Sequence, residues 1–210
     1  MNDLIIVGAG GFGREMAQII EDINNVEMTW NVLGYIDDNE DALNGYPTEY
    51  RILGTIQDWV PKDDQYYACA IANPEAKKKV TDYLKGKGAK FASIIHPTAI
   101  IGKFNRIGEG FIAYPNAVVT SNVTIGNFVA LLSSAVGHDA VVGDFTTICA
   151  FSDITGGCHI GSYVWMGTHS AVIPGRTLGD HVFVSAGSVV MTDFPDSVKV
   201  LGNPARKMNF

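Results

Sequence analysis

Aliphatic residues recur every six positions through the second half of the chain. The series has one step of five residues, between Leu131 and Val136, and then keeps its phase for nine consecutive hexads. A period of six does not fit the 3.6 residues per turn of an α-helix, and it is too long for one hairpin strand. It is typical of a coil with three flat faces, each a single short strand. The inward positions are Ile95, Ile101, Ile107, Ala113, Val119, Ile125, Leu131, Val136, Val142, Ile148, Ile154, Ile160, Met166, Val172, Leu178, Val184 and Val190.

Two further preferences accompany this period. A glycine directly follows many of the aliphatic residues, where we expect a corner with positive φ, a conformation that glycine adopts at little cost. These corner glycines are Gly102, Gly108, Gly126, Gly137, Gly143, Gly161, Gly167 and Gly179. Four residues after each aliphatic position we expect a second, small inward residue, such as Ala117, Thr146 or Ser152. A β-rich domain with repeated turns is the alternative, but it would not keep phase for so long. The sequence therefore predicts an all-β parallel β-helix over residues 93–210, whose flat faces could pack against copies of the chain.

The first 92 residues have the pattern of an α/β nucleotide-binding fold. Residues 4–7 predict a buried strand, and residues 8–13 form a Gly-x-Gly-x-x-Gly turn. A helix follows, with apolar residues at i, i+3, i+4 and i+7 from Met16, and a second strand over 32–36 ends at an Asp-Asp pair. In this layout a helix N-terminus and bare backbone amides hold a pyrophosphate, and the acid meets a ribose hydroxyl or a base edge. A tight turn without a ligand is the alternative.

The number of strands in this segment indicates which kind of nucleotide it can bind. A third strand over 66–71 and a helix from Asn73 to about residue 84 give about four strands before residue 95. A complete dinucleotide fold needs two β-α-β-α-β halves, and only one fits. We therefore expect a half-Rossmann domain over residues 1–92 that binds a mononucleotide diphosphate in preference to NAD.

Composition narrows the class of protein. With 210 residues, 47% apolar and 18% charged, the chain has the composition of a soluble globular protein. A net charge of −7 disfavours a nucleic-acid partner. The apolar run of residues 4–7 stops at Gly8, too soon for a signal peptide or a membrane span. Three cysteines without CxxC spacing are typical of reduced thiols. We expect a cytoplasmic protein that does not insert into a membrane.

Among five histidines, His138 is the candidate catalytic residue. It follows the corner Gly137, comes just after the shortened hexad, and precedes Asp139. It should therefore face outward at a coil edge, beside a carboxylate that could hold the tautomer of an imidazole acting as general base. A solvated surface side chain is the alternative for each histidine. A zinc site would need three converging ligands, whereas the intervals from His138 through the later histidines are 21, 10 and 12 residues, so we expect no metal.

Five segments together resemble a known family. They are the GAGGFG turn, the strand ending IDD, the sequence IIHPTAIIG that leads into the repeats, the repeat GHDAVVGDF, and the tail GNPARKM. Across essentially its whole length the chain resembles the bacterial sugar acetyltransferases of the NeuD/PglD kind. The resemblance implies a left-handed β-helix and acetyl transfer from acetyl-CoA, with His138 as general base and Asp139 beside it. It also implies a homotrimer with active sites between neighbouring subunits.

The resemblance carries further residues over one by one. The implied nucleotide-sugar site consists of Gly8, Gly10, Gly11, Phe12, Asp37, Asp38 and Asn73. The implied acetyl-CoA site consists of Thr147, Gly156, Thr168, Ala186 and Arg206. The implied acceptor is the amine of a nucleotide-linked 4-amino-4,6-dideoxy sugar, with UDP as the expected nucleotide.

Two positions depart from some relatives. Some relatives have an asparagine seven residues before the catalytic histidine, where this chain has Leu131. They also have a second histidine nine residues after it, where this chain has Thr147. These departures concern the acceptor, so O-acetylation of a sugar or of sialic acid is the alternative reaction. Two other classes are a non-catalytic nucleotide-sugar-binding protein and an NAD-dependent oxidoreductase. The presence of His138 disfavours the former, and the single half-fold disfavours the latter.

Overall fold

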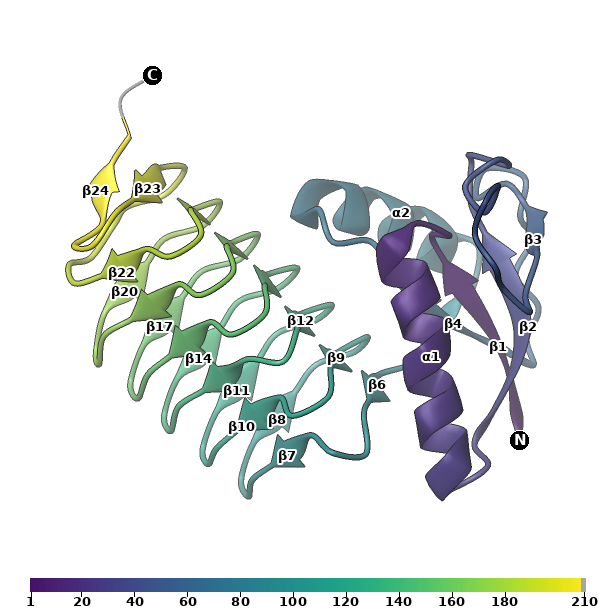
Figure 1. Ribbon diagram of the computed structural model, residues 1–210, viewed down its shortest axis with the longest axis horizontal. Coiled ribbons are helices and arrows are strands. Elements are labelled where there is room, and N and C mark those ends of the chain that lie inside the picture. Colours follow the sequence, from purple (N-terminus) through teal and green to yellow (C-terminus); the bar gives the residue numbers. More distant parts are fainter. Residues whose placement is uncertain (209–210) are drawn as a thin grey trace. The chain divides into compact units, whose positions relative to one another are not determined.

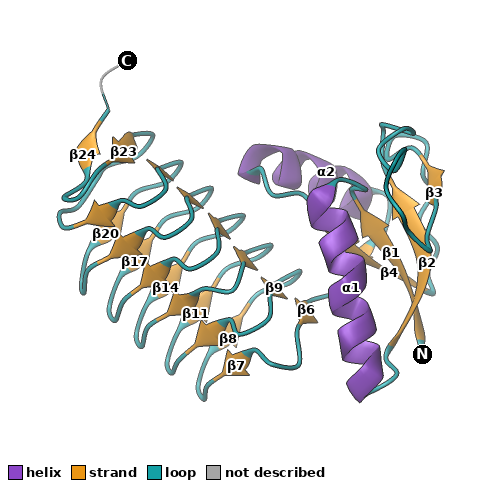
Figure 2. Ribbon diagram, viewed as in Figure 1, coloured by secondary structure: helices purple, strands orange, loops and turns teal. Residues whose placement is uncertain are grey.

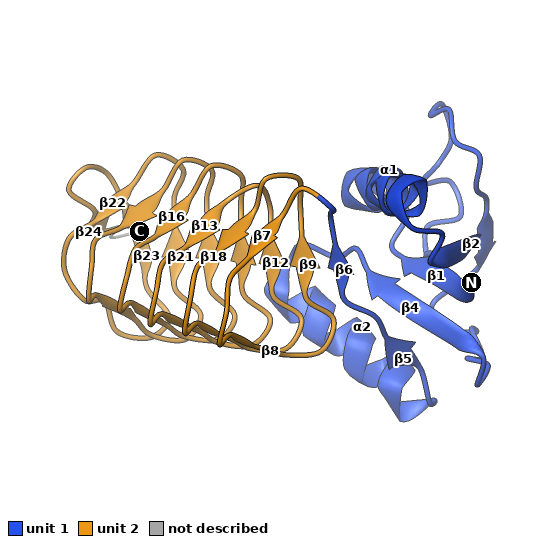
Figure 3. Cartoon of the chain, turned by 90° about the horizontal axis from the view of Figure 1, so that it is seen from below, with its two compact units in different colours: residues 1–97 blue, residues 98–210 orange. Residues whose placement is uncertain are grey.

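The computed structural model describes residues 1–208, and the chain divides into two compact units, Met1–Pro97 and Thr98–Phe210 (Figure 3). The division expected from the sequence, between residues 92 and 93, falls inside the first unit.

The first unit is built on a five-stranded parallel sheet of order β3-β2-β1-β4-β5. Its strands are β1 (Asn2–Val7), β2 (Trp30–Ile36), β3 (Ile52–Gly54), β4 (Gln65–Cys69) and β5 (Lys90–Phe91), and β6 (Ile94–Ile95) follows them. The helices are α1 (Gly11–Val26) and α2 (Pro74–Gly86). The sequence missed β3, because three half-buried residues at a sheet edge carry no periodic pattern.

The chain order places the two helices on opposite faces of this sheet. The connection through α1 runs from β1 to β2, toward one edge, whereas the connection through α2 runs from β4 to β5, toward the other. Right-handed crossovers in opposite directions leave their helices on opposite faces, as Figure 3 shows. Central strand β1 is therefore covered on both sides, and its residues from Leu4 to Val7 are fully buried. Neither helix is long and apolar enough to cross a membrane within the described residues.

The second unit is a stack of coils with three parallel sheets (Figures 1 and 2). The first sheet contains β7 (Ile100–Ile101), β10 (Val118–Val119), β13 (Ala135–Val136), β16 (Asp153–Ile154), β19 (Ala171–Val172) and β22 (Val189–Val190). The second contains β8 (Arg106–Ile107), β11 (Thr124–Ile125), β14 (Val141–Val142), β17 (His159–Ile160) and β20 (Thr177–Leu178). The third includes β9 (Ile112–Ala113), β12 (Ala130–Leu131), β15 (Thr147–Ile148), β18 (Trp165–Met166), β21 (Phe183–Val184), β23 (Lys199–Leu201) and the antiparallel β24 (Arg206–Lys207). The predicted fold class, a half-Rossmann domain followed by a left-handed parallel β-helix, is confirmed.

The core of the β-helix is filled by the two predicted inward positions of each hexad, one aliphatic and one small. The aliphatic positions from Ala113 to Val190 are buried, and so are small residues such as Ala117 and Ala140. Where the small position carries a hydroxyl, the group finds a partner on the next coil: Thr146 Oγ1 donates to the Gly161 carbonyl at 2.9 Å. These hydroxyls therefore fill the narrow interior without leaving an unpaired polar atom.

The reason expected for the corner glycines is wrong. Positive φ lies two residues later, mostly at non-glycine residues such as Phe104, Phe128 and Asp139. The glycines are needed because consecutive coils approach closely. A Cβ built on Gly143 would lie 2.5 Å from the Ser162 backbone nitrogen, closer than real Cβ contacts come.

Gly143→Ala should therefore destabilise the β-helix. Backbone on the next coil cannot yield as a side chain could, so the midpoint of urea unfolding should fall, by about 1–3 kcal/mol of unfolding free energy. Gly86→Ala is the matched control, because a Cβ there meets nothing within 4 Å. An unchanged midpoint in Gly143→Ala would contradict the close approach.

Candidate active site

His138 lies in the loop between β13 and β14, at the corner where the first sheet gives way to the second. Its side chain is 68% exposed and points outward, as the hexad phase predicted. The backbone is held from the next coil, because the Gly157 amide donates to the His138 carbonyl at 2.8 Å. The imidazole is thus accessible on a fixed main chain.

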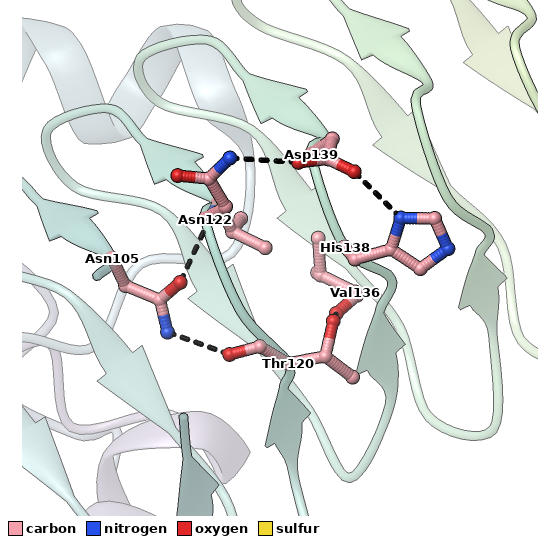
Figure 4. Close-up of polar contacts among 7 residues, drawn as sticks. Asn105, Thr120, Asn122, Val136, His138 and Asp139 are labelled. Carbon is pink, nitrogen blue, oxygen red and sulfur yellow. Dashed lines mark hydrogen bonds and ion pairs between the residues drawn. The ribbon is translucent and has the colours of Figure 1, made fainter. Parts of the chain in front are cut away.

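The next residue binds the imidazole directly. His138 Nδ1 lies 2.7 Å from Asp139 Oδ2, and Asn122 Nδ2 donates to Asp139 Oδ1 at 2.8 Å (Figure 4). The hydrogen bond from Asn122 holds the pKa of the Asp139 carboxyl below its ordinary value, and the hydrogen bond with His138 acts in the same direction with a smaller effect. An ionised carboxylate only accepts hydrogen bonds, so the neutral ring carries its proton on Nδ1 and its lone pair on Nε2. This tautomer is the one that can remove a proton.

The imidazole also lies close to a glycine of the next coil. Gly156 follows His138 by one coil at the same corner, and a Cβ built on it would lie 2.6 Å from His138 Nε2 and Cε1. No side chain can occupy this position without displacing the ring. Gly156 therefore shapes the space in which the imidazole is held.

Two of the residues expected to bind acetyl-CoA lie at another corner. Thr168 and Ala186 are exposed in loops leading from the third sheet to the first, and the Gly187 amide donates to the Thr168 carbonyl at 2.9 Å. Gly156 shares the corner of His138, Arg206 lies exposed in β24, and Thr147 is fully buried in β15. One chain alone therefore does not bring this set together.

The glycine turn of the first unit has the predicted tight form. Gly8 has φ +101°, and a Cβ on Gly13 would lie 2.0 Å from the Gly8 carbonyl oxygen, so both positions require glycine. A Cβ on Gly10, the N-cap of α1, would meet nothing within 4 Å, which leaves this part of the turn open. Asp37 Oδ2 accepts a hydrogen bond from the Ala9 amide at 2.7 Å. The acid at the end of β2 thereby fixes the turn.

Asp38 lies at a cavity that sequence analysis did not predict. Its Oδ1 accepts from the Ile56 amide at 2.8 Å, and the cavity of about 540 Å³ is within the range of small-molecule sites. Besides Asp38 the cavity is lined by Ile56, Gln57, Ala76, Lys79, Val80 and Tyr83. Four of these occupy i, i+3, i+4 and i+7 on α2, a spacing visible in the sequence.

The other two residues expected in the nucleotide-sugar site lie at the N-termini of helices. Asn73 caps α2, since its Oδ1 accepts from the Ala76 amide at 2.9 Å. Phe12 lies half-buried in the first turn of α1. Among residues 1–208, no group of three or more His, Cys, Asp or Glu side chains could hold a metal ion.

Known proteins of similar sequence or fold cover essentially the whole chain. Residues 3–84 match the family described as the PglD N-terminal domain. GDP-perosamine N-acetyltransferase of Escherichia coli O157:H7 is 29% identical, over 99% of this chain and 97% of that protein. The acetyltransferase domain of PglB from Neisseria gonorrhoeae FA1090, in complex with acetyl coenzyme A, is 26% identical with a TM-score of 0.89, over 99% of this chain and 100% of that one. PerB from Caulobacter crescentus, in complex with CoA and GDP-perosamine, shares the fold at 23% identity, with a TM-score of 0.88 over 100% and 98% of the two chains.

Proposed function

The chain belongs to the NeuD/PglD-type sugar acetyltransferases, and from this premise we propose that it transfers the acetyl group of acetyl-CoA to the amine of a nucleotide-linked 4-amino-4,6-dideoxy sugar. The family predicted from the sequence motifs is confirmed, and with it the class of enzyme, an acyltransferase. The observation that carries the proposed mechanism is the exposed His138 imidazole, held at 2.7 Å by Asp139 with Nε2 available as a base.

The reaction is a direct transfer without a covalent enzyme intermediate. The sugar amine attacks the thioester carbonyl carbon, a C–N bond forms, and the C–S bond breaks as coenzyme A leaves as the thiolate. His138 Nε2 removes the proton that the amine loses, and Asp139 stabilises the resulting imidazolium. The proton then passes to the thiolate, so the histidine returns to its neutral form.

A neighbouring subunit would complete the acetyl-CoA site. Thr168 and Ala186 lie at a different corner from His138. In a homotrimer of β-helices, this corner of one subunit can lie beside the His138 corner of the next. We place the pantetheine arm in that groove, next to Gly156 and backbone near Thr147, with Arg206 near the coenzyme.

The first unit supplies the groups that a nucleotide diphosphate requires. The turn from Gly8 to Gly13 offers open backbone at Gly10 and Gly11 for the diphosphate, and the cavity at Asp38 has room for a base. UDP is the nucleotide that the family resemblance implies. The name of the full-length relative, a GDP-perosamine N-acetyltransferase, favours GDP as the second candidate.

O-acetylation is the second candidate reaction, and one observation favours it. Leu131 and Thr147, at positions that are asparagine and histidine in some relatives, are both fully buried. Neither side chain of this chain is therefore exposed to an acceptor.

Thiol release from acetyl-CoA by the purified protein tests the proposal. The acceptors are 4-amino-4,6-dideoxy sugars linked to UDP, dTDP and GDP, together with sialic acid. Turnover with one amino sugar supports N-acetylation and identifies the nucleotide. Turnover with sialic acid alone moves the proposal to O-acetylation, and no thiol release with any acceptor overturns it in favour of a binding protein.

Asp37→Ala should raise KM for the nucleotide sugar by about tenfold with little change in kcat. The variant removes the carboxylate that fixes the Ala9 amide, so the diphosphate turn loosens while the chemical step is untouched. Initial rates at saturating acetyl-CoA measure the effect. Asp41→Ala, which removes an exposed carboxylate of the same loop, is the control. An unchanged KM in Asp37→Ala would show that the glycine turn does not contribute to binding of the nucleotide sugar.

A further inference from the structure

Asn122 and Asp139 occupy the same corner of successive coils. Asn122 lies in the loop between β10 and β11, and Asp139 in the loop between β13 and β14. Both have positive φ, of 64° and 60°. Asparagine and aspartate adopt this conformation more readily than most side chains do. The side chains thus project from equivalent points of two stacked coils.

This stacking engages both oxygens of the carboxylate. Oδ1 accepts from Asn122 and Oδ2 from His138, at 2.8 and 2.7 Å. A carboxylate with one oxygen bound can rotate about its terminal bond, whereas one bound through both oxygens is held in a single plane. The asparagine therefore restricts the orientation of the group that orients the base.

Asn122 is itself fixed by the preceding coil. Its backbone N–H donates to the Lys103 carbonyl at 3.2 Å. Asn105 holds the turn on both sides, since its Oδ1 accepts from the Val123 amide at 2.8 Å and its Nδ2 donates to the Thr120 carbonyl at 2.9 Å. Figure 4 shows the resulting series of contacts from Asn105 to His138 across three coils.

We propose that Asn122 is a positioning residue for acetyl transfer, which orients Asp139 so that the carboxylate holds His138 with Nε2 directed outward. This inference rests on the proposed function, because it assigns a role in the same reaction. Asn122 does not touch the reacting atoms in this account; it acts through Asp139.

A merely structural role at the corner is the competing explanation. Asn122→Asp separates the two, because aspartate has the shape of asparagine and Asp139 already occupies an equivalent corner. The variant keeps the backbone conformation, but it replaces the donor by a second carboxylate facing Asp139 Oδ1. Asn122→Gly also tolerates positive φ and removes the donor without adding charge.

Asn122→Asp should lower kcat by about tenfold or more, and Asn122→Gly by a smaller factor, with KM for acetyl-CoA unchanged in both. The added negative charge favours the protonated imidazole, so the pH at which activity falls on the acid side should move upward in Asn122→Asp. Other ionisable residues of neighbouring coils, Lys103, Arg106 and His159, are the same in every variant. Ser197→Asp adds a carboxylate at a positive-φ corner between the second and third sheets, away from the proposed site, and should leave kcat and the pH profile unchanged.

The experiment compares these variants with the wild-type protein and His138→Ala in the thiol-release assay, with circular dichroism as the check of folding. Loss of kcat in folded Asn122→Asp, together with the shifted pH profile, supports the positioning role. Wild-type kcat and pH profile in Asn122→Asp, with His138→Ala inactive, overturn this inference and leave the proposed function intact. Full activity in His138→Ala overturns the proposed function instead.

Discussion

Replacing His138 by alanine should lower kcat by about 10²–10⁴-fold, because a positioned general base contributes a factor of this size. The side chain is exposed and buries no core surface, so the variant should fold with wild-type stability. KM for acetyl-CoA should change little, since the histidine acts on the acceptor amine. The measurement is initial-rate kinetics with both substrates saturating.

His159→Ala is the matched control for this variant. His159 is an exposed histidine on β17 of the same β-helix, and its removal should leave kcat unchanged. Full activity in His138→Ala under saturating conditions would show that another group removes the proton.

Gly156→Ala should lower kcat by about a hundredfold without unfolding the protein. The added methyl group meets the His138 ring at 2.6 Å, and the ring is a movable side chain, so it turns away from its place beside Asp139. Misplacement of a catalytic group by about 1 Å can cost a factor of this size. Unlike Gly143→Ala, in which the new atom meets backbone, the cost should fall on the rate and not on the urea midpoint.

A double variant tests that cause. If Gly156→Ala acts only through the imidazole, it should have no further effect on the residual rate of His138→Ala, so the two changes are strongly non-additive. Gly86→Ala serves as the control for a glycine-to-alanine change in open space. A folded Gly156→Ala with wild-type kcat would contradict the placement of the ring against Gly156.

The β-helix could be predicted from the sequence because a repeat multiplies one weak signal many times. The inward pattern from Ala113 to Val190, including buried hydroxyls such as Thr146, followed from phase alone. The role of the corner glycines did not follow, because close approach between coils depends on stacking, and stacking is not local in sequence. For the same reason the pattern did not show that positive φ falls two residues later, at residues such as Asp139.

The candidate site was predictable in its centre and not in its surroundings. His138 and Asp139 are adjacent in sequence, so their pairing could be expected from the hexad phase. Asn122 precedes Asp139 by 17 residues, the length of the one coil shortened between Leu131 and Val136. Counting back from Asp139 by one coil of 17 residues, instead of the usual 18, identifies Asn122 from the sequence.

The first unit shows the same limit. The glycine turn has a local signature, and its tight form is the one expected from it. The cavity at Asp38 needs β2, the turn after β3 and one face of α2 to come together. Each of these segments was visible or partly visible in the sequence, but their juxtaposition depends on the strand order of the sheet.

The most direct test of the central claim follows the acetyl group itself. The purified protein is incubated with acetyl-CoA labelled with carbon-13 at the carbonyl and with the nucleotide-linked 4-amino sugar that gives turnover, and the product is analysed by NMR. The account predicts that the labelled carbonyl forms an amide with the sugar nitrogen, with one coenzyme A thiol released per amide and a rate reduced at least a hundredfold in His138→Ala. A labelled ester on a sugar hydroxyl, or a label that remains on coenzyme A with every acceptor, would contradict it.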